Sequence, residues 1–119
     1  MQMLTTQNDD DNITLDIDIE YSKFMRSNHF TFIKGYCKAN KFGLYVRKSC
    51  RKNVHLKIIP RFKLPLLTKF EIRALLGDDK YRLIIDLVRH YKGMELNRLW
   101  DTKFKKGKLY HAGRWHKVI

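Results

Sequence analysis

The sequence has few of the residues that mark secreted, disulfide-stapled or membrane proteins. Its 119 residues include only 2 cysteines, 2 prolines and 6 glycines, and no apolar run approaches the roughly 18 residues of a membrane-spanning helix. Cys37 and Cys50 are too few for a disulfide framework and do not have zinc-finger spacing. The start, MQMLTTQNDDDN, lacks the basic and apolar regions of a secretory signal. We therefore expect a cytoplasmic protein with reduced thiols and no membrane contact.

Acidic residues are also scarce, and they are placed unevenly. Lys and Arg number 25 against 12 Asp and Glu, which gives a net charge of +13. Because six of these acids and none of the basic residues lie within residues 1–20, residues 21–119 carry a net charge of +19. Such a basic body predicts a polyanionic partner, most often nucleic acid, because neutralising phosphates releases their counterions.

The remaining composition predicts one folded domain. With 44% hydrophobic and 13% aromatic residues, the chain has enough apolar surface to bury a core. Residues 1–12 are polar and acidic, and we expect them to form a flexible tail. Residues 13–119 then form the single domain.

Hydrophobic periodicity predicts the order of the elements in this domain. Strict or near-strict alternation predicts strands over residues 13–20, 43–49, 53–59 and 81–88. Helical spacing predicts helices over residues 22–40 and 68–76, the second starting with a capping box at Thr68 and ending at Gly77. Residues 99–119 are typical of a hairpin with its turn at 105–108, and Gly77-Asp78-Asp79 is typical of a helix end and turn. The order β-α-β-β-α-β predicts an α+β, RRM- or ferredoxin-like fold: an antiparallel sheet with both helices on one face, plus a C-terminal hairpin.

The strand positions that should face away from the helices hold an informative set of side chains. Because the more apolar positions of each strand should face the helices, the open face receives Asp16, Asp18, His55, Lys57 and Asp86. Carboxylates two residues apart on a strand lie roughly 6–7 Å apart at Cα, so their oxygens can share cations. This arrangement predicts a two-metal site for Mg²⁺ or Mn²⁺ and metal-assisted phosphoryl transfer. The basic turn with Ser49, Arg51 and Lys52 could hold the triphosphate of a nucleotide.

Three segments resemble the motifs of the archaeo-eukaryotic primase (primase-polymerase) superfamily. Asp16-Ile17-Asp18, inside ITLDIDI, is similar to the first motif, in which two aspartates flank an apolar residue after an apolar run. The segment from Ser49 to His55 is similar to the second, in which a serine precedes a histidine on a basic turn. Leu83-Ile84-Ile85-Asp86 resembles the third, two apolar residues followed by an aspartate.

The resemblance implies a role for each matching residue. Asp16, Asp18 and Asp86 would be catalytic and would bind the two metals, and Ser49, Arg51 and His55 would bind the nucleotide. The neighbouring Lys52 and Lys57 extend this predicted nucleotide site. The implied function is a nucleotidyltransferase core, a primase or primer-extending polymerase.

The same resemblance implies the partners. They would be a DNA or RNA template, nucleoside triphosphates, and a helicase or other replication protein. Cys50 and Asn53 stand where the second motif usually has glycine, and the chain is short for the superfamily. The alternatives are a minimal catalytic core, of the kind a virus or mobile element encodes, and an eroded relative.

A non-catalytic RRM-like module that binds RNA or DNA is the alternative function. Gly43-Leu44-Tyr45-Val46-Arg47 echoes the aromatic RNA-binding strand of that fold. The predicted nucleic-acid contacts of the tail are Lys103, Lys105, Lys106, Lys108, Trp100 and Trp115. Asp86 separates the two hypotheses. Catalysis requires its carboxylate to converge with those of Asp16 and Asp18, whereas a position on the helix side favours the binding module.

Overall fold

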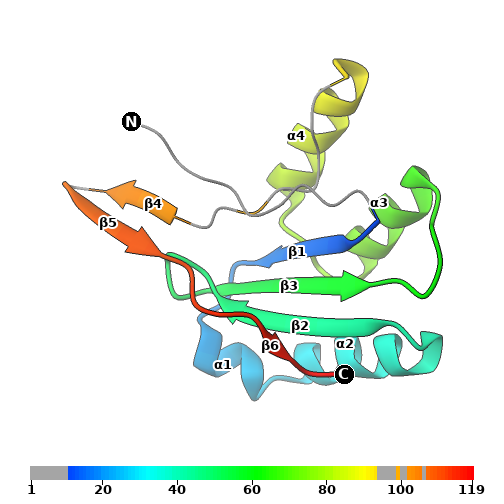
Figure 1. Ribbon diagram of the computed structural model, residues 1–119, viewed down its shortest axis with the longest axis horizontal. Coiled ribbons are helices and arrows are strands. Elements are labelled where there is room, and N and C mark those ends of the chain that lie inside the picture. The colour runs from blue at the N-terminus through cyan, green and yellow to red at the C-terminus, as the bar shows by residue number, and fades with distance from the viewer. Residues whose placement is uncertain (1–10, 94–98, 100–101, 106) are drawn as a thin grey trace.

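A four-stranded antiparallel sheet forms the centre of the domain (Figure 1). The computed structural model describes residues 11–93, 99, 102–105 and 107–119, with only the backbone described at 102–105. The strands of the sheet are β1 (Ile13–Ile17), β2 (Gly43–Lys48), β3 (Val54–Ile59) and β6 (His116–Lys117), in the order β1-β3-β2-β6. The first three were predicted, although β1 ends three residues earlier than its alternation suggested.

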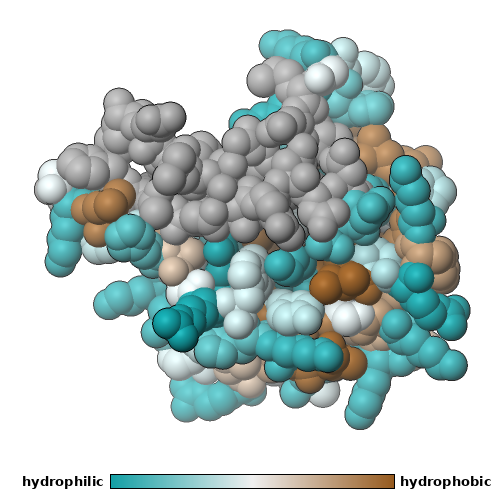
Figure 2. All heavy atoms as spheres, viewed as in Figure 1, coloured by the Kyte–Doolittle hydropathy of each residue, from teal (hydrophilic) through white to brown (hydrophobic). Residues whose placement is uncertain are grey.

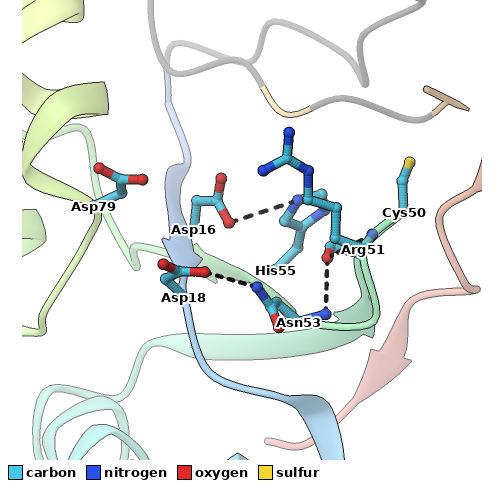
Figure 3. Close-up of a pocket in the computed structure, with 8 residues that line it drawn as sticks. Asp16, Asp18, Cys50, Arg51, Asn53, His55 and Asp79 are labelled. Carbon is cyan, nitrogen blue, oxygen red and sulfur yellow. Dashed lines mark hydrogen bonds and ion pairs between the residues drawn. The ribbon is translucent and has the colours of Figure 1, made fainter. Parts of the chain in front are cut away.

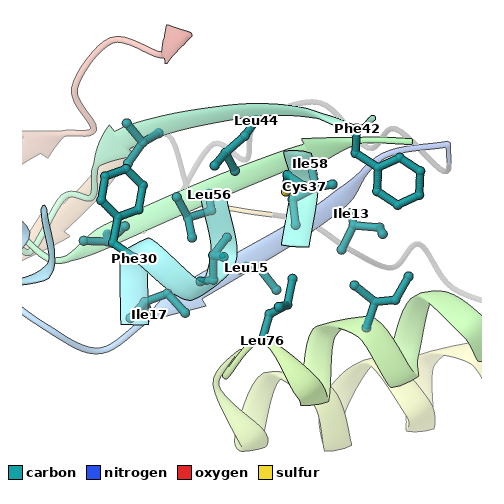
Figure 4. Packing of buried hydrophobic residues seen from close by; sticks show 14 of the residues in the cluster. Ile13, Leu15, Ile17, Phe30, Cys37, Phe42, Leu44, Leu56, Ile58 and Leu76 are labelled. Carbon is teal, nitrogen blue, oxygen red and sulfur yellow. The ribbon is translucent and has the colours of Figure 1, made fainter. Parts of the chain in front are cut away.

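Strand alternation divides the sheet into an apolar and a polar face. The positions that face the core are Ile13, Leu15, Ile17, Leu44, Val46, Val54, Leu56 and Ile58 (Figure 4). The register pairs Asp16 with His55 and Tyr45 with Lys57 on the opposite face. The predicted facing of β1 and β3 is therefore confirmed.

The predicted helix over 22–40 is present as two helices. They are α1 (Tyr21–Met25) and α2 (Asn28–Asn40). The break falls at Ser27, whose hydroxyl accepts a hydrogen bond from the backbone amide of Phe30 at 3.1 Å and so caps α2. Ile33 and Cys37 follow Phe30 at helical spacing and are buried with it against the sheet.

Helix α3 (Leu66–Leu75) begins directly after Pro65, two residues before the predicted start. The capping box at Thr68 was wrong, because Thr68 lies inside the helix and Pro65 occupies the N-cap position without a side-chain hydrogen bond. Ile72 packs into the same core as α2, and so does Leu76, which follows the last turn. The helix ends as predicted before Gly77, which has a φ of +89°.

The strand predicted over 81–88 was wrong, because this segment is helix α4 (Lys80–Tyr91). Asp79 accepts a hydrogen bond from the amide of Tyr81 at 2.8 Å and caps the helix. Charged residues recur three and four positions apart at Arg82, Asp86 and Arg89, which is helical periodicity. The β-α-β-β-α-β order of an RRM is therefore not confirmed, since no strand follows α3 beside β1 among the described residues.

The C-terminal segment contains the predicted hairpin and one strand that was not predicted. The hairpin consists of β4 (Thr102–Lys105) and β5 (Lys108–His111). After it, β6 pairs with β2 and supplies the fourth strand of the sheet, at the edge opposite β1. The result is an α+β domain. Among its described helices, none combines the length and the apolar character that crossing a bilayer requires.

Candidate functional site

The predicted first and second motifs meet in one cleft on the polar face of the sheet (Figure 3). The cleft has a volume of about 270 Å³. The residues that line it are Asp16, Asp18, Ser49, Cys50, Arg51, Asn53, His55 and Asp79. Five of the predicted site residues are thus brought together, namely Asp16, Asp18, Ser49, Arg51 and His55.

Asp16 and His55 face each other across β1 and β3. The Oδ1 atom of Asp16 lies 3.9 Å from Nε2 of His55. Burial raises the pKa of the Asp16 carboxyl to about 6, against the lowering effect of Arg82. Burial also lowers the pKa of His55 to about 3, and the positive charge of Arg47 acts in the same direction. At neutral pH the pair therefore consists of a carboxylate and an uncharged imidazole.

Ser49 organises the turn that carries Arg51 into the cleft. Its hydroxyl accepts hydrogen bonds from the backbone amides of Asn53 at 3.0 Å and Arg51 at 3.3 Å. Its own amide donates to the carbonyl of Asn53 at 3.0 Å. Because the hydroxyl holds the turn closed, Ser49 is a positioning residue. Lys52 is exposed on this turn and does not line the cleft.

The second carboxylate, Asp18, lies just beyond the end of β1. Its Oδ1 atom accepts a hydrogen bond from Nδ2 of Asn53 at 2.8 Å. This contact links the end of β1 to the turn between β2 and β3, and both residues line the cleft (Figure 3).

The turn between α3 and α4 lies along the edge of β1 that does not pair with β3. The amide of Asp16 donates to Oδ1 of Asp78 at 2.8 Å, and the amide of Asp79 donates to the carbonyl of Asp16 at 3.1 Å. Arg82 donates to the carbonyl of Thr14 at 2.8 Å. These bonds satisfy backbone groups that an edge strand leaves open, and they bring Asp79 to the cleft.

Asp86 is not in the cleft, so its predicted position on the open face of the sheet was wrong. It is 2% exposed, and its Oδ2 atom lies 2.8 Å from Nη2 of Arg73. Arg73 also pairs with Asp78 at 2.7 Å. Asp86 does contribute to a neighbouring hollow that Asp16 and Asp79 also line. Its carboxylate is held by a buried arginine and does not converge with that of Asp18.

The third carboxylate of the predicted two-metal centre is engaged outside the cleft. Asp86 is paired with Arg73, and an oxygen of Asp79 caps α4. Within the ranges that the structure describes, no group of three or more His, Cys, Asp or Glu residues could hold a metal ion. We therefore derive no metal-dependent step from this cleft.

The remaining predicted contacts lie elsewhere. Lys57 lies on the polar face of β3, where its Nζ atom is 4.6 Å from the ring centre of Trp115, and Lys108 is exposed on β5. Lys103 and Lys105 belong to β4, but their side chains are outside the described part of the chain, as are Trp100 and Lys106 altogether.

Two residues of the site were missed from the sequence. Asp79 was interpreted only as part of a turn, although an aspartate just before a helical charge pattern is a typical N-cap. Arg47 donates a hydrogen bond from Nε to Nδ1 of His55 at 3.0 Å. Its alternation with Tyr45 on β2, opposite His55 on β3, would have placed it on the same face.

Comparison with known proteins adds no relative. The chain matches no protein-family model, and neither the curated proteins nor the solved structures contain a match to it.

Proposed function

We propose that this protein binds single-stranded nucleic acid through the basic and aromatic part of its sheet. We call this part the Trp115 face and define it by Tyr45, Lys57, Trp115 and Lys117. The observation that carries the proposal is the packing of cations against an accessible indole. Arg47 lies 4.5 Å and Lys57 4.6 Å from the ring centre of Trp115, which is only half-buried.

The two halves of the polar face differ in charge. On the β1 side the face carries Asp16 and Asp18, which repel phosphate. On the β2 and β6 side, Lys57 and Lys117 both flank Tyr45, because the register places each of them opposite it. A phosphate backbone therefore crosses the β2 and β6 side, and its unpaired bases can stack on Tyr45 and Trp115.

The wider surface suits a polyanion. Hydrophilic side chains cover most of the described surface in the view of Figure 2. The net charge of +19 over residues 21–119 supplies the long-range attraction, so binding should weaken steeply as salt rises. This use of a sheet face is that of the RRM-like binding module, and it requires no metal.

The test measures the affinity of a labelled single-stranded oligonucleotide of about 20 nucleotides, as DNA and as RNA, by fluorescence anisotropy. The phosphate contacts of two lysines are expected to be lost in Lys57→Glu/Lys117→Glu and replaced by repulsion, so the Kd should rise at least about tenfold. The matched control is Lys23→Glu/Lys38→Glu, which changes the charge equally at exposed positions of α1 and α2. An equal loss in both pairs, or no binding by the parent at about 50 mM salt, contradicts the proposal.

A second function, a primase-like nucleotidyltransferase, is favoured by one observation. Asp16 and Asp18 of the first motif line the same cleft as Arg51 and His55 of the second. The test is primer synthesis and extension with Mg²⁺ and with Mn²⁺, comparing the parent with Asp16→Asn/Asp18→Asn. Metal-dependent incorporation that the double variant abolishes supports this function. Equal incorporation by both proteins, or none by the parent, rejects it.

A further inference from the structure

Helix α4 has its charged side inside and its apolar side outside. Asp86 is the buried residue of the helix, and it pairs with Arg73. The outer face of α4 consists of exposed apolar and aromatic residues, namely Tyr81, Ile84, Ile85, Leu87, Val88 and Tyr91. In Figure 1 the helix extends away from the sheet, so most of its length is not covered by the core.

This outer face is large for an unpartnered surface. The exposed fractions are 84% for Tyr91, 69% for Tyr81 and 48–58% for the four aliphatic side chains. With roughly 150–250 Å² for each aromatic side chain, the face presents on the order of 600 Å². Monomeric proteins rarely expose a larger contiguous apolar patch than this. Two such faces in contact would bury about 1,200 Å², which is where specific interfaces begin.

We propose that the outer face of α4 binds the same face of a second copy of this chain, with the two helices antiparallel. The six residues of the outer face form three matching pairs about Asp86. Ile85 matches Leu87, and Ile84 matches Val88. Farther out, Tyr81 matches Tyr91 and Lys80 matches Lys92.

A two-fold interface must be complementary to itself, and these matching pairs place apolar residues opposite apolar residues in an antiparallel arrangement. In such an interface residue i contacts residue j of the partner while j contacts i. An antiparallel pair centred near Ile84 and Val88 places Ile84 against Val88 of the partner subunit. Tyr81 then packs against Tyr91 of the partner subunit, roughly 15 Å from the matching contact at the other end.

Charge sets the salt dependence of this dimer. Two chains of net charge +13 repel each other, and the geometry also brings Lys80 near Lys92 of the partner subunit. Salt screens this repulsion while leaving the apolar contact intact. Dimerisation should therefore strengthen as salt rises, whereas an acidic partner on the same face would bind more weakly.

The first test is sedimentation equilibrium of the full chain without nucleic acid, which keeps its outcome separate from that of the proposed function. Ile84→Glu/Val88→Glu places charges at the centre of the contact and should raise the dimer Kd at least about tenfold. The control is Phe32→Glu, at a 52% exposed aromatic residue on α2. Circular dichroism confirms that each variant is folded. A parent that stays monomeric at about 100 μM and high salt, or a double variant that dimerises like the parent, overturns the proposal.

The second test addresses the orientation of the two helices. In the antiparallel pair, Lys80→Glu places a carboxylate near Lys92 of the partner subunit. The dimer Kd at low salt should therefore fall severalfold. Lys80→Glu/Lys92→Glu restores like charges at both ends and should remove this gain. An unchanged Kd for Lys80→Glu overturns the antiparallel arrangement.

Discussion

Arg47 determines which nitrogen of His55 carries its proton. Because a guanidinium can only donate, the 3.0 Å hydrogen bond from Nε of Arg47 leaves Nδ1 of His55 unprotonated. The proton of the neutral ring is then on Nε2, which faces Asp16. A buried imidazole held in this way resists a second proton, which agrees with its lowered pKa.

His55 should make the fold sensitive to acid. Its pKa is about 3 in the folded protein against 6.5 for an ordinary histidine, so between these values only the unfolded chain takes up the proton. The free energy of unfolding should fall by up to about 1.4 kcal/mol for each pH unit below 6.5. Urea unfolding of the parent and His55→Gln between pH 7 and pH 4 measures this. The variant should show the shallower dependence.

The control for this measurement is His90→Gln, at an exposed position of α4. It should keep the slope of the parent, because His90 is exposed and does not line the cleft. Equal slopes for His55→Gln and the parent would contradict the assignment of a neutral, buried His55.

Asp16 should have the opposite effect on stability. Burial raises its pKa to about 6 from 3.8. The carboxylate therefore lowers the free energy of unfolding at high pH, and this effect disappears as the pH falls through 6 towards 4. Since the side chain is 38% exposed, solvent screening reduces the gain expected for Asp16→Asn at pH 8 to about 1 kcal/mol. Urea unfolding at pH 8 and pH 4 should show this gain at the higher pH only. A gain of the same size at both pH values would show that the charge of Asp16 is not its source.

Periodicity predicted the part of the fold in which one face of each element is buried. Ile13, Leu15 and Ile17 alternate because β1 has one buried face, and Phe30 and Ile33 follow helical spacing for the same reason. Helix α4 does not follow this rule. Its apolar residues face outward and its buried side chain is Asp86, so burial and hydropathy disagree and the alternation over 81–88 was misleading.

The part of the cleft that depends on strand facing was predicted. Asp16 and His55 meet because facing residues of neighbouring strands share a side. Asp79 could not be placed in the same way, since its approach depends on hydrogen bonds between a distant turn and the edge of β1. Asp86 was misplaced because residues 81–88 were interpreted as a strand, whereas they belong to helix α4, whose buried side pairs Asp86 with Arg73.

The ion pair of Asp86 and Arg73 should be structural. Asp86→Asn removes one of the two carboxylates that pair with the buried guanidinium of Arg73 and leaves Asp78 as the other, so it should lower the free energy of unfolding by about 3 kcal/mol, the lower end of the cost of breaking a buried ion pair. Replacing both residues in Arg73→Met/Asp86→Leu should recover much of this loss, because no unpaired charge then remains. Thermal and urea unfolding measure both effects. A carboxylate held for metal binding would instead give a more stable protein when neutralised, and that result would contradict the structural role.

The control is Asp18→Asn, which removes an exposed carboxylate that accepts a bond from Asn53. Because that contact is solvated, its loss should cost less than about 1 kcal/mol.

Two glycines should respond in opposite ways to the same substitution. Gly77 has a φ of +89°, and a Cβ atom there would lie 2.8 Å from the ring of His29, whose Nε2 atom is 2.7 Å from the carbonyl oxygen of Leu76. Gly77→Ala should therefore lower the free energy of unfolding by about 1–3 kcal/mol. Gly35 lies within α2 with nothing inside 4 Å of a Cβ atom, so Gly35→Ala should raise it by about 0.5–1 kcal/mol. Urea unfolding of the two variants gives both signs, and a stabilising Gly77→Ala would contradict the turn that brings Asp79 to the cleft.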